Sequence, residues 1–133
     1  MNPLYAAVAE RAHGRCEYCN APEEVFNFAF EVEHIRPVSS GGGHEPENLA
    51  LACHSCNRYK SDYTHSIDEA TNQVVPLFNP RRDVWTEHFR VEKLTAEIAG
   101  ISATGRVTVA RLQMNRPRHV IARLRWMQFG VFP

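Results

Sequence analysis

Two Cys-x-x-Cys pairs, Cys16–Cys19 and Cys53–Cys56, constrain this chain more than any other feature of its sequence. A Cys-x-x-Cys turn lets two sulfurs point at one centre, and two such turns supply the four ligands of a tetrahedral metal site. Four thiolates fill the coordination sphere of zinc, so the site would be structural and closed to substrate. Such a site would hold the ends of the segment 20–52 side by side.

Cysteine pairs of this kind have two other common uses. An iron–sulfur cluster takes four thiolates, and redox-active pairs occur on thioredoxin-like folds. A thioredoxin-like frame needs a preceding strand and a long following helix, which residues 4–20 do not supply. In a reducing compartment disulfides are disfavoured. The pattern therefore favours structural zinc bound by all four cysteines.

Length and composition predict one globular domain spanning 1–133, because 44% of the residues are hydrophobic. No apolar run approaches the roughly 20 residues that cross a membrane. The first residues lack the charged and then apolar layout of a secretion signal. We therefore expect a cytoplasmic protein with no membrane partner, while no pattern predicts its oligomeric state.

The formal net charge is zero, but acidic and basic residues are unevenly distributed. No acidic residue follows Glu97, whereas six arginines do: Arg106, Arg111, Arg116, Arg118, Arg123 and Arg125. An unbalanced basic tail is typical of a surface that faces phosphates. The alternative interpretation is a solvated helix face.

Secondary-structure signals are clearest before residue 62. The predicted elements are a helix over 4–13, a strand over 25–35, a flexible loop over 38–47, a strand over 48–52 and a helix from Cys53 onward. The order strand, loop, strand, helix suits a hairpin attached to the cysteine site. Phe26, Phe28 and Phe30 alternate along the first strand and are predicted to form the hairpin core.

Signals are weaker after residue 62. The predictions are a strand over 74–78, one or two strands within 85–101, an element of undecided type over 106–114 and a helix over 117–129. The last helix carries one apolar face, formed by Val120, Ile121, Leu124 and Met127. Three aromatic residues are expected to pack the C-terminal half onto the cysteine module: Trp85, Phe89 and Trp126.

The segment 16–62 resembles the zinc-containing HNH endonuclease family. The resemblance is carried by Glu33-His34-Ile35-x-Pro37, the glycine-rich loop, Asn48-Leu49 and Cys53-x-x-Cys56-Asn57-x-x-Lys60, in the family's order and spacing. It implies an α+β fold with a ββα-metal core over 14–62, stapled by the four-cysteine zinc site. A C-terminal α/β extension over 63–133 would end in a helix. Leu77-Phe78-Asn79-Pro80-Arg81 and Trp85-x-x-His88-Phe89 resemble an extension found in some bacterial HNH proteins.

The resemblance implies a metal-dependent endonuclease that acts on DNA, with RNA as an open alternative. His34 is the implied general base, a role that suits an imidazole because its ordinary pKa is roughly 6.5. Glu33 and Asn57 are the implied oxygen ligands of a catalytic Mg²⁺ or Mn²⁺. Asn48 is expected to hold the loop and orient His34. Glu33 replaces the family's frequent aspartate, and Asn57 stands where many members have histidine.

Basic residues near the motif are expected to contact phosphates: Arg36, Arg58 and Lys60. Four further histidines are expected to be bystanders: His44, His54, His65 and His88. Two other classes of function stay open at this point. A non-catalytic zinc-dependent nucleic-acid-binding module would make Glu33 and His34 incidental, and a structural or protein-interaction zinc domain would bind no nucleic acid.

Overall fold

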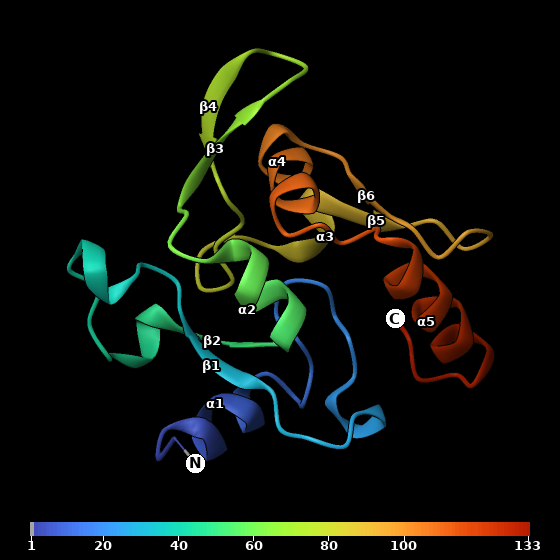
Figure 1. The fold of residues 1–133 in the computed structure, drawn as a ribbon, viewed down its shortest axis with the longest axis horizontal. Helices are drawn as coiled ribbons and strands as arrows, with labels where there is room; N and C mark the ends of the chain where they lie inside the picture. The colour runs from blue at the N-terminus through green and yellow to red at the C-terminus, as the bar shows by residue number, and fades with distance from the viewer. Residues whose placement is uncertain (1) are drawn as a thin grey trace.

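Three separate two-stranded antiparallel sheets organise residues 2–133, the part of the chain that the computed structural model describes (Figure 1). The strand pairs are β1 (Glu31–His34) with β2 (Leu49–Ala52), β3 (His65–Asp68) with β4 (Gln73–Pro76), and β5 (Phe89–Val91) with β6 (Ile98–Gly100). The α-helices are α1 (Tyr5–Arg11), α2 (His54–Lys60), α3 (Trp85–His88), α4 (Ala103–Arg111) and α5 (Pro117–Gln128). The fold is therefore α+β, as predicted.

The order strand, loop, strand, helix is confirmed in the first half of the chain. In the β1–β2 ladder His34 lies opposite Leu49 and Glu31 lies opposite Ala52. Helix α2 follows directly, with Cys53 as its N-cap residue and the Cys53 sulfur accepting from the Cys56 amide at 3.4 Å. The second cysteine pair therefore begins the helix that covers the hairpin.

The predicted strand over 25–35 was too long, because β1 contains only Glu31–His34. A short 3-10 turn occupies Glu23–Val25, and the Phe30 amide donates to the Glu23 carboxylate at 2.7 Å. The alternating phenylalanines form an edge-to-face cluster in which the Phe26 ring contacts Phe28 and Phe30. Only Phe30 is buried in the core, since Phe28 is 54% exposed.

The loop between β1 and β2 contains two 3-10 turns, η2 (Val38–Ser40) and η3 (Pro46–Asn48). Gly41 lies between them with a φ of +86° and ends η2, a backbone conformation that favours glycine. The segment therefore has a defined path along the edge of the hairpin.

In the second half, β4 overlaps the predicted strand over 74–78, and β3 was missed. The region 106–114 is helical as far as Arg111, where α4 (Ala103–Arg111) ends. Helix α4 begins at an N-cap, Ser102, whose hydroxyl accepts from the Gly105 amide at 2.9 Å. It packs against β3, β4 and β6, so it connects two of the three sheets.

Helix α5 confirms the prediction over 117–129, and Val120, Leu124 and Met127 of the expected apolar face are half-buried. Its one residue classed as buried is Arg123, while Ile121 is 58% exposed. The Arg123 guanidinium donates to the backbone carbonyls of Ala96, at 2.8 Å, and Met114. Burial lowers the pKa of this guanidinium from its ordinary value. Arg123 is therefore a structural residue and is not part of a phosphate-facing surface.

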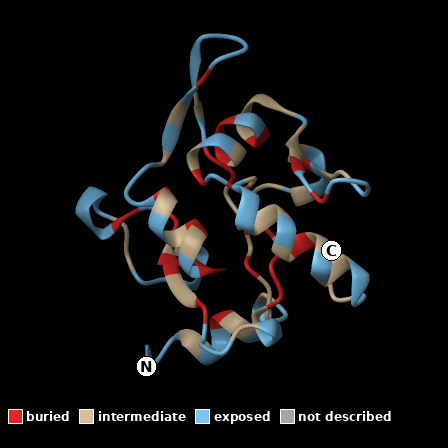
Figure 2. Ribbon diagram, turned by 45° about the vertical axis from the view of Figure 1, so that its right-hand side comes forward, coloured by how far each residue is buried: buried red, intermediate tan, exposed pale blue. Residues whose placement is uncertain are grey.

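Buried residues from both halves form one continuous core cluster. Figure 2 marks the buried residues in red along the ribbon of both halves. The Trp85 indole donates to the Tyr18 carbonyl at 2.7 Å, and the Tyr18 ring meets Phe78 edge to face. Trp126 contacts Phe26. The expected packing onto the cysteine module is therefore present for Trp85 and Trp126, while Phe89 packs against Phe78 and Trp85 within the C-terminal half. None of the described helices is long and apolar enough to cross a membrane.

Candidate functional site

The four cysteines form one buried cluster whose ligand atoms all lie within 4.8 Å of one another. The sulfurs of Cys19 and Cys53 are 3.8 Å apart. Zn–S bonds of about 2.3 Å in a tetrahedron place sulfurs about 3.8 Å apart. The donor set, its burial and its spacing therefore fit a structural zinc ion that joins the loop after α1 to the start of α2.

Helix α2 lies along one face of β1 and presents residues at intervals of three. His54 Nδ1 is 3.1 Å from Glu31 Oε1, and Asn57 donates to the other oxygen of the same carboxylate. One turn further, Lys60 reaches Glu33. Glu31 and Glu33 are two apart in the strand and share this face.

Glu33 is buried in the interface between β1 and α2. We expected its carboxylate to be a ligand of a catalytic metal ion, but in the structure the carboxylate faces protein groups. Its Oε1 lies 2.6 Å from Lys60 Nζ, and its Oε2 accepts from the Tyr18 hydroxyl at 2.8 Å. The two side chains of the ion pair are 3% and 2% exposed. Burial, followed by the Glu33 charge, raises the pKa of Tyr18 well above its ordinary value, so the hydroxyl keeps its proton and donates. Both carboxylate oxygens are therefore engaged by protein groups.

Lys60 is also buried, so the expectation that it contacts phosphates is wrong for this structure. Its ammonium donates to the Ile35 carbonyl at 2.9 Å in addition to pairing with Glu33. A lysine held in this way fastens the C-terminal end of α2 to the end of β1. Its charge balances Glu33 in the interior.

Replacing Lys60 with methionine is expected to reduce the free energy of unfolding by about 3–5 kcal/mol, because Glu33 is left buried without a partner. The double variant Lys60→Met/Glu33→Gln removes both charges and should recover part of that loss. Urea unfolding at a fixed zinc concentration measures both. A single variant as stable as the wild type would contradict the buried pair.

His34 lies on the opposite face of β1 from Glu33, because neighbouring residues in a strand point to opposite sides. Its Nε2 is 2.8 Å from Nδ1 of His44, a residue of the glycine-rich loop. The three implied site residues therefore have different partners: His34 contacts His44, Glu33 contacts Lys60, and Asn57 contacts Glu31. Glu33 and Asn57, the expected ligands of a catalytic cation, both lie between β1 and α2, where each contacts another protein side chain.

Asn48 fastens the glycine-rich loop. Its Oδ1 accepts from the Arg36 amide at 2.8 Å, and its Nδ2 donates to the carbonyls of Arg36 and Gly43 at 3.0 and 2.8 Å. A Cβ on Gly42 would lie 1.8 Å from the Arg36 carbonyl oxygen, so only glycine permits this close approach. Asn48 thus closes the loop at its base and determines where the loop carries His44.

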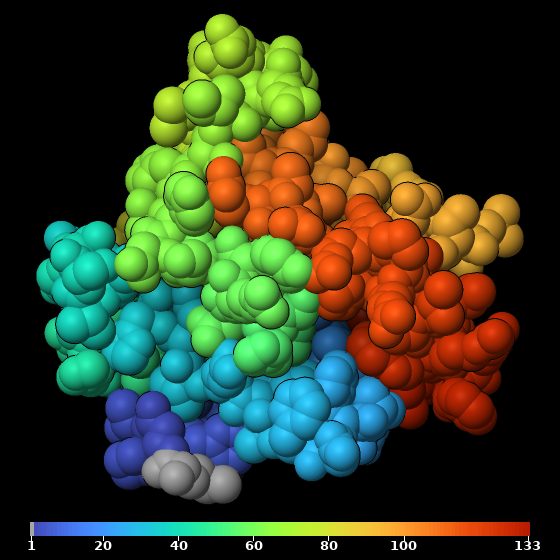
Figure 3. Space-filling model, viewed as in Figure 1, coloured from blue at the N-terminus to red at the C-terminus, as the bar shows by residue number. Residues whose placement is uncertain are grey.

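Exposed basic side chains lie beside α2. Arg36 and Arg58 are exposed. Two arginines of the basic tail stack on tyrosines at the end of α2: the Arg111 guanidinium is 3.9 Å from the Tyr63 ring centroid, and Arg116 is 5.1 Å from that of Tyr59. Figure 3 shows α2 (green) at the centre of one face, between the glycine-rich loop (turquoise) and the C-terminal helices (orange and red).

The tail as a whole is not one phosphate-facing surface. Arg106 pairs with the buried Asp68 carboxylate at 2.9 Å, and its guanidinium lowers the pKa of Asp68 to about 2. Arg123 is buried, as described above. Two of the six arginines therefore serve the fold.

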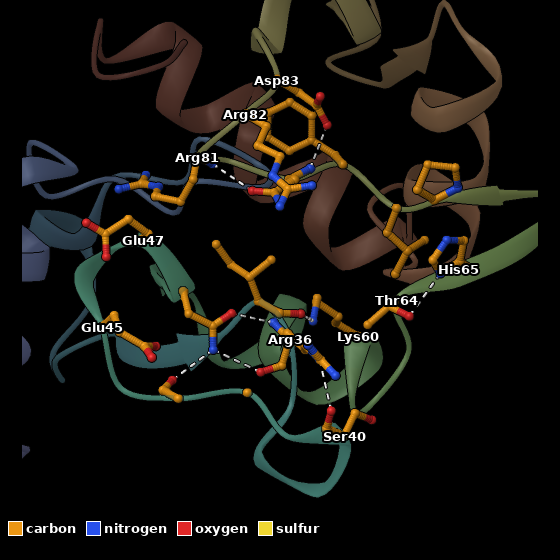
Figure 4. Close-up of a pocket in the computed structure, with 18 of the residues that line it drawn as sticks. Arg36, Ser40, Glu45, Glu47, Lys60, Thr64, His65, Arg81, Arg82 and Asp83 are labelled. Atoms are coloured by element: carbon orange, nitrogen blue, oxygen red, sulfur yellow. Dashed lines mark hydrogen bonds between the residues drawn. The ribbon is translucent and has the colours of Figure 1, made fainter.

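A cavity of about 960 Å³ separates the glycine-rich loop from the segment 76–83 (Figure 4). Arg36 and Ser40 line one side, and Arg82 and Asp83 line the other. Glu45 and Glu47 also line it, so its charge is mixed. His34 does not line this cavity. This cavity is therefore lined by the glycine-rich loop but not by the candidate catalytic histidine.

Sequence reasoning missed two residues of this site, His44 and Glu31. Glu31 could have been identified from its register, because it shares a strand face with Glu33 and meets the helix positions 54 and 57. His44 carried no such signal, since the path of a loop rich in glycine is not encoded by periodicity. It was expected to be a bystander.

Of three comparisons with known proteins, one found a similarity, and it covers this region. A family model described as HNH endonuclease matches residues 16–63, which comprise the four cysteines, the β1–β2 hairpin and α2. The searches against curated proteins and against solved structures returned no significant match.

Proposed function

We propose, from the HNH endonuclease domain that residues 16–63 form, that this protein hydrolyses phosphodiester bonds in DNA with His34 as the general base. One observation carries the proposal. The family match coincides with the complete hairpin, helix and cysteine frame, and the motif histidine ends β1, where its ring reaches the loop and stays partly exposed.

The chemistry assigned to His34 is a proton transfer. A water molecule gives a proton to the imidazole, and the resulting hydroxide attacks phosphorus. The bond from phosphorus to the leaving oxygen breaks, and that oxygen takes a proton from solvent to become the hydroxyl end. HNH domains use divalent metal ions, and such an ion supplies charge stabilisation at the leaving oxygen when bound. Since Glu33 is engaged by Lys60 and Tyr18, the steps assigned to the described residues are proton transfer and positioning alone.

A nicking assay on supercoiled plasmid, with Mg²⁺ or Mn²⁺ added to the zinc-loaded protein, tests the activity. We expect conversion to the open circular form and resealing of the nicks by a DNA ligase, since the family's products carry 5′-phosphate and 3′-hydroxyl ends. Plasmid that stays supercoiled with either ion, at protein concentrations sufficient for binding, would reject the proposal.

The surface proposed to hold DNA combines Arg58, Arg111 and Arg116 with Tyr59 and Tyr63. Guanidinium groups stacked on tyrosine rings keep their outer N–H groups available for phosphate oxygens. Arg116 also donates to the Tyr59 hydroxyl, which joins the start of α5 to α2. The contact would lie on the α2 face that Figure 3 shows.

Replacing Arg58 or Arg116 with glutamine is expected to weaken DNA binding, because each variant removes a positive charge that faces a phosphate. The slope of log K against log salt concentration should become shallower by about 0.9 for each phosphate that is no longer neutralised. Fluorescence anisotropy with labelled duplex at several salt concentrations measures the slope. Arg90→Gln is the matched control, because Arg90 is exposed on β5 and pairs with Glu92. Equal slopes for wild type and the Arg58 and Arg116 variants would exclude this surface.

The pairing of Glu33 with Lys60 and Tyr18 favours a second candidate, a zinc-dependent nucleic-acid-binding module without catalysis. In that case DNA binding would depend on salt as above, and no nicking would follow at any concentration of Mg²⁺ or Mn²⁺. Binding and nicking assays on one preparation distinguish the two candidates.

A further inference from the structure

We propose that His44 is a positioning residue: its Nδ1 accepts a hydrogen bond from Nε2–H of His34, which leaves Nδ1 of His34 free to take a proton from water. This inference deepens the proposed function and rests on it. His44 comes from the glycine-rich loop, ten residues along the chain from His34.

The contact between the two rings is close and directional. His34 Nε2 and His44 Nδ1 are 2.8 Å apart, a normal hydrogen-bond length. The ring centroids are 4.9 Å apart and the ring planes meet at 73°, so the two rings are arranged edge to face. Among the described residues, neither ring makes another hydrogen bond to a side chain or backbone group.

The loop is built to bring His44 to this place. Asn48 closes the loop by its bonds to the backbone of Arg36 and Gly43, and Gly43 directly precedes His44. Gly42 permits the close approach to the Arg36 carbonyl that starts the return of the chain. The strand end that carries His34 and the loop position that carries His44 are therefore tied to the same asparagine.

The hydrogen bond can form in two ways, and only one leaves His34 able to act. If Nε2 of His34 donates, its Nδ1 keeps a free lone pair. If Nδ1 of His44 donates instead, neutral His34 carries its own proton on Nδ1 and has no free nitrogen for water. The first arrangement places both rings in the Nε2–H tautomer, which neutral imidazole prefers in water.

The same bond supports the proton transfer itself. When His34 accepts the proton from water at Nδ1, its Nε2–H becomes a donor on a positively charged ring. A charged donor makes a stronger hydrogen bond, so the contact with His44 strengthens as the imidazolium forms. The hydrogen bond to His44 therefore stabilises the protonated form of His34 and also fixes the orientation of the His34 ring.

Long-range ¹H–¹⁵N NMR correlations of the imidazole rings, recorded on the zinc-loaded protein at alkaline pH, test the arrangement without requiring activity. The signals of His34 are assigned by their absence in His34→Ala. We expect an Nε2–H proton on His34 that exchanges slowly in the wild type and rapidly in His44→Ala. A proton on Nδ1 of His34 in the wild type would overturn the inference.

Kinetics of nicking provide the second measurement. His44→Ala should lower kcat by about tenfold to a hundredfold with little change in KM, the size expected for one charge-assisted hydrogen bond. His44→Asn should restore much of kcat, because its amide oxygen lies where Nδ1 lies in histidine. Equal kcat values for wild type and His44→Ala would overturn the inference, as would an Asn variant no better than the Ala variant.

These outcomes separate the inference from the function on which it rests. Wild-type protein that does not nick DNA rejects the proposed function, and the NMR measurement then decides the hydrogen bond by itself. Wild-type protein that nicks DNA and is indifferent to residue 44 retains the nuclease and rejects the role of His44. Retained zinc content in His44→Ala, whose side chain is exposed, establishes that the variant is folded.

Discussion

Replacing His34 with alanine is expected to reduce plasmid nicking by about 10²–10⁴-fold, because general-base catalysis contributes an acceleration of that order. The fold should be unaffected, since the ring lies at the end of β1 and its hydrogen bond is to His44. Initial rates of nicking at saturating plasmid, with zinc content and circular dichroism measured on the same samples, provide the comparison.

His65→Ala is the matched control for this experiment. His65 is an exposed histidine on β3 whose side-chain hydrogen bond is to its neighbour Thr64. It should nick at the wild-type rate. Undiminished cleavage by His34→Ala would remove His34 as the base, and equal losses in both variants would indicate a general effect of removing imidazole.

Replacing Cys53 with serine is expected to abolish zinc binding and cooperative folding. Cys53 belongs to the four-cysteine cluster that fits zinc and is also the N-cap of α2, where its sulfur accepts from the Cys56 amide. Apparent binding energies of structural zinc in small modules are about 10–16 kcal/mol, which exceeds the net stability of most domains of this size. Zinc stoichiometry and thermal unfolding followed by circular dichroism measure the effect.

Ser55→Ala is the control for the cysteine replacement, since residue 55 lies between the two ligands of the same pair and offers no sulfur. It should keep one zinc per chain and the wild-type melting temperature. A Cys53→Ser protein that keeps one zinc per chain and the wild-type melting temperature would show that neither zinc binding nor folding needs the Cys53 sulfur. The comparison also reports on α2, because loss of its N-cap would lower helical content.

The cysteine cluster and the order of the elements around it could be predicted because both are encoded locally. A Cys-x-x-Cys turn specifies its own geometry, and apolar alternation or helical spacing specifies the element that follows. The α2 helix begins where the second pair predicts it. The same local rules failed for 25–30, where the Glu23 carboxylate competes with a strand partner for the Phe30 amide.

The charges of the basic tail did not reveal which of its arginines face solvent and which have partners inside the fold. Six arginines without acidic neighbours indicate a phosphate-facing surface, yet Arg106 finds Asp68, 38 positions earlier in the chain. Arg123 is directed inward by the path of α5 and donates to carbonyl groups of two other segments. Such partners are distant in sequence and become neighbours only when the halves pack together.

From the sequence alone came the four sulfur ligands, the hairpin with its helix, and a histidine at the strand end, because each depends on residues close together in the chain. The tertiary structure decided which side chains meet across that frame. Because neighbouring residues of a strand point to opposite faces, Glu33 points to the buried face of β1, where it meets Lys60, and His34 points to the opposite face. The return of the glycine-rich loop, closed by Asn48, brings His44 against His34. These contacts depend on how separate segments approach one another, which no local pattern of residues encodes.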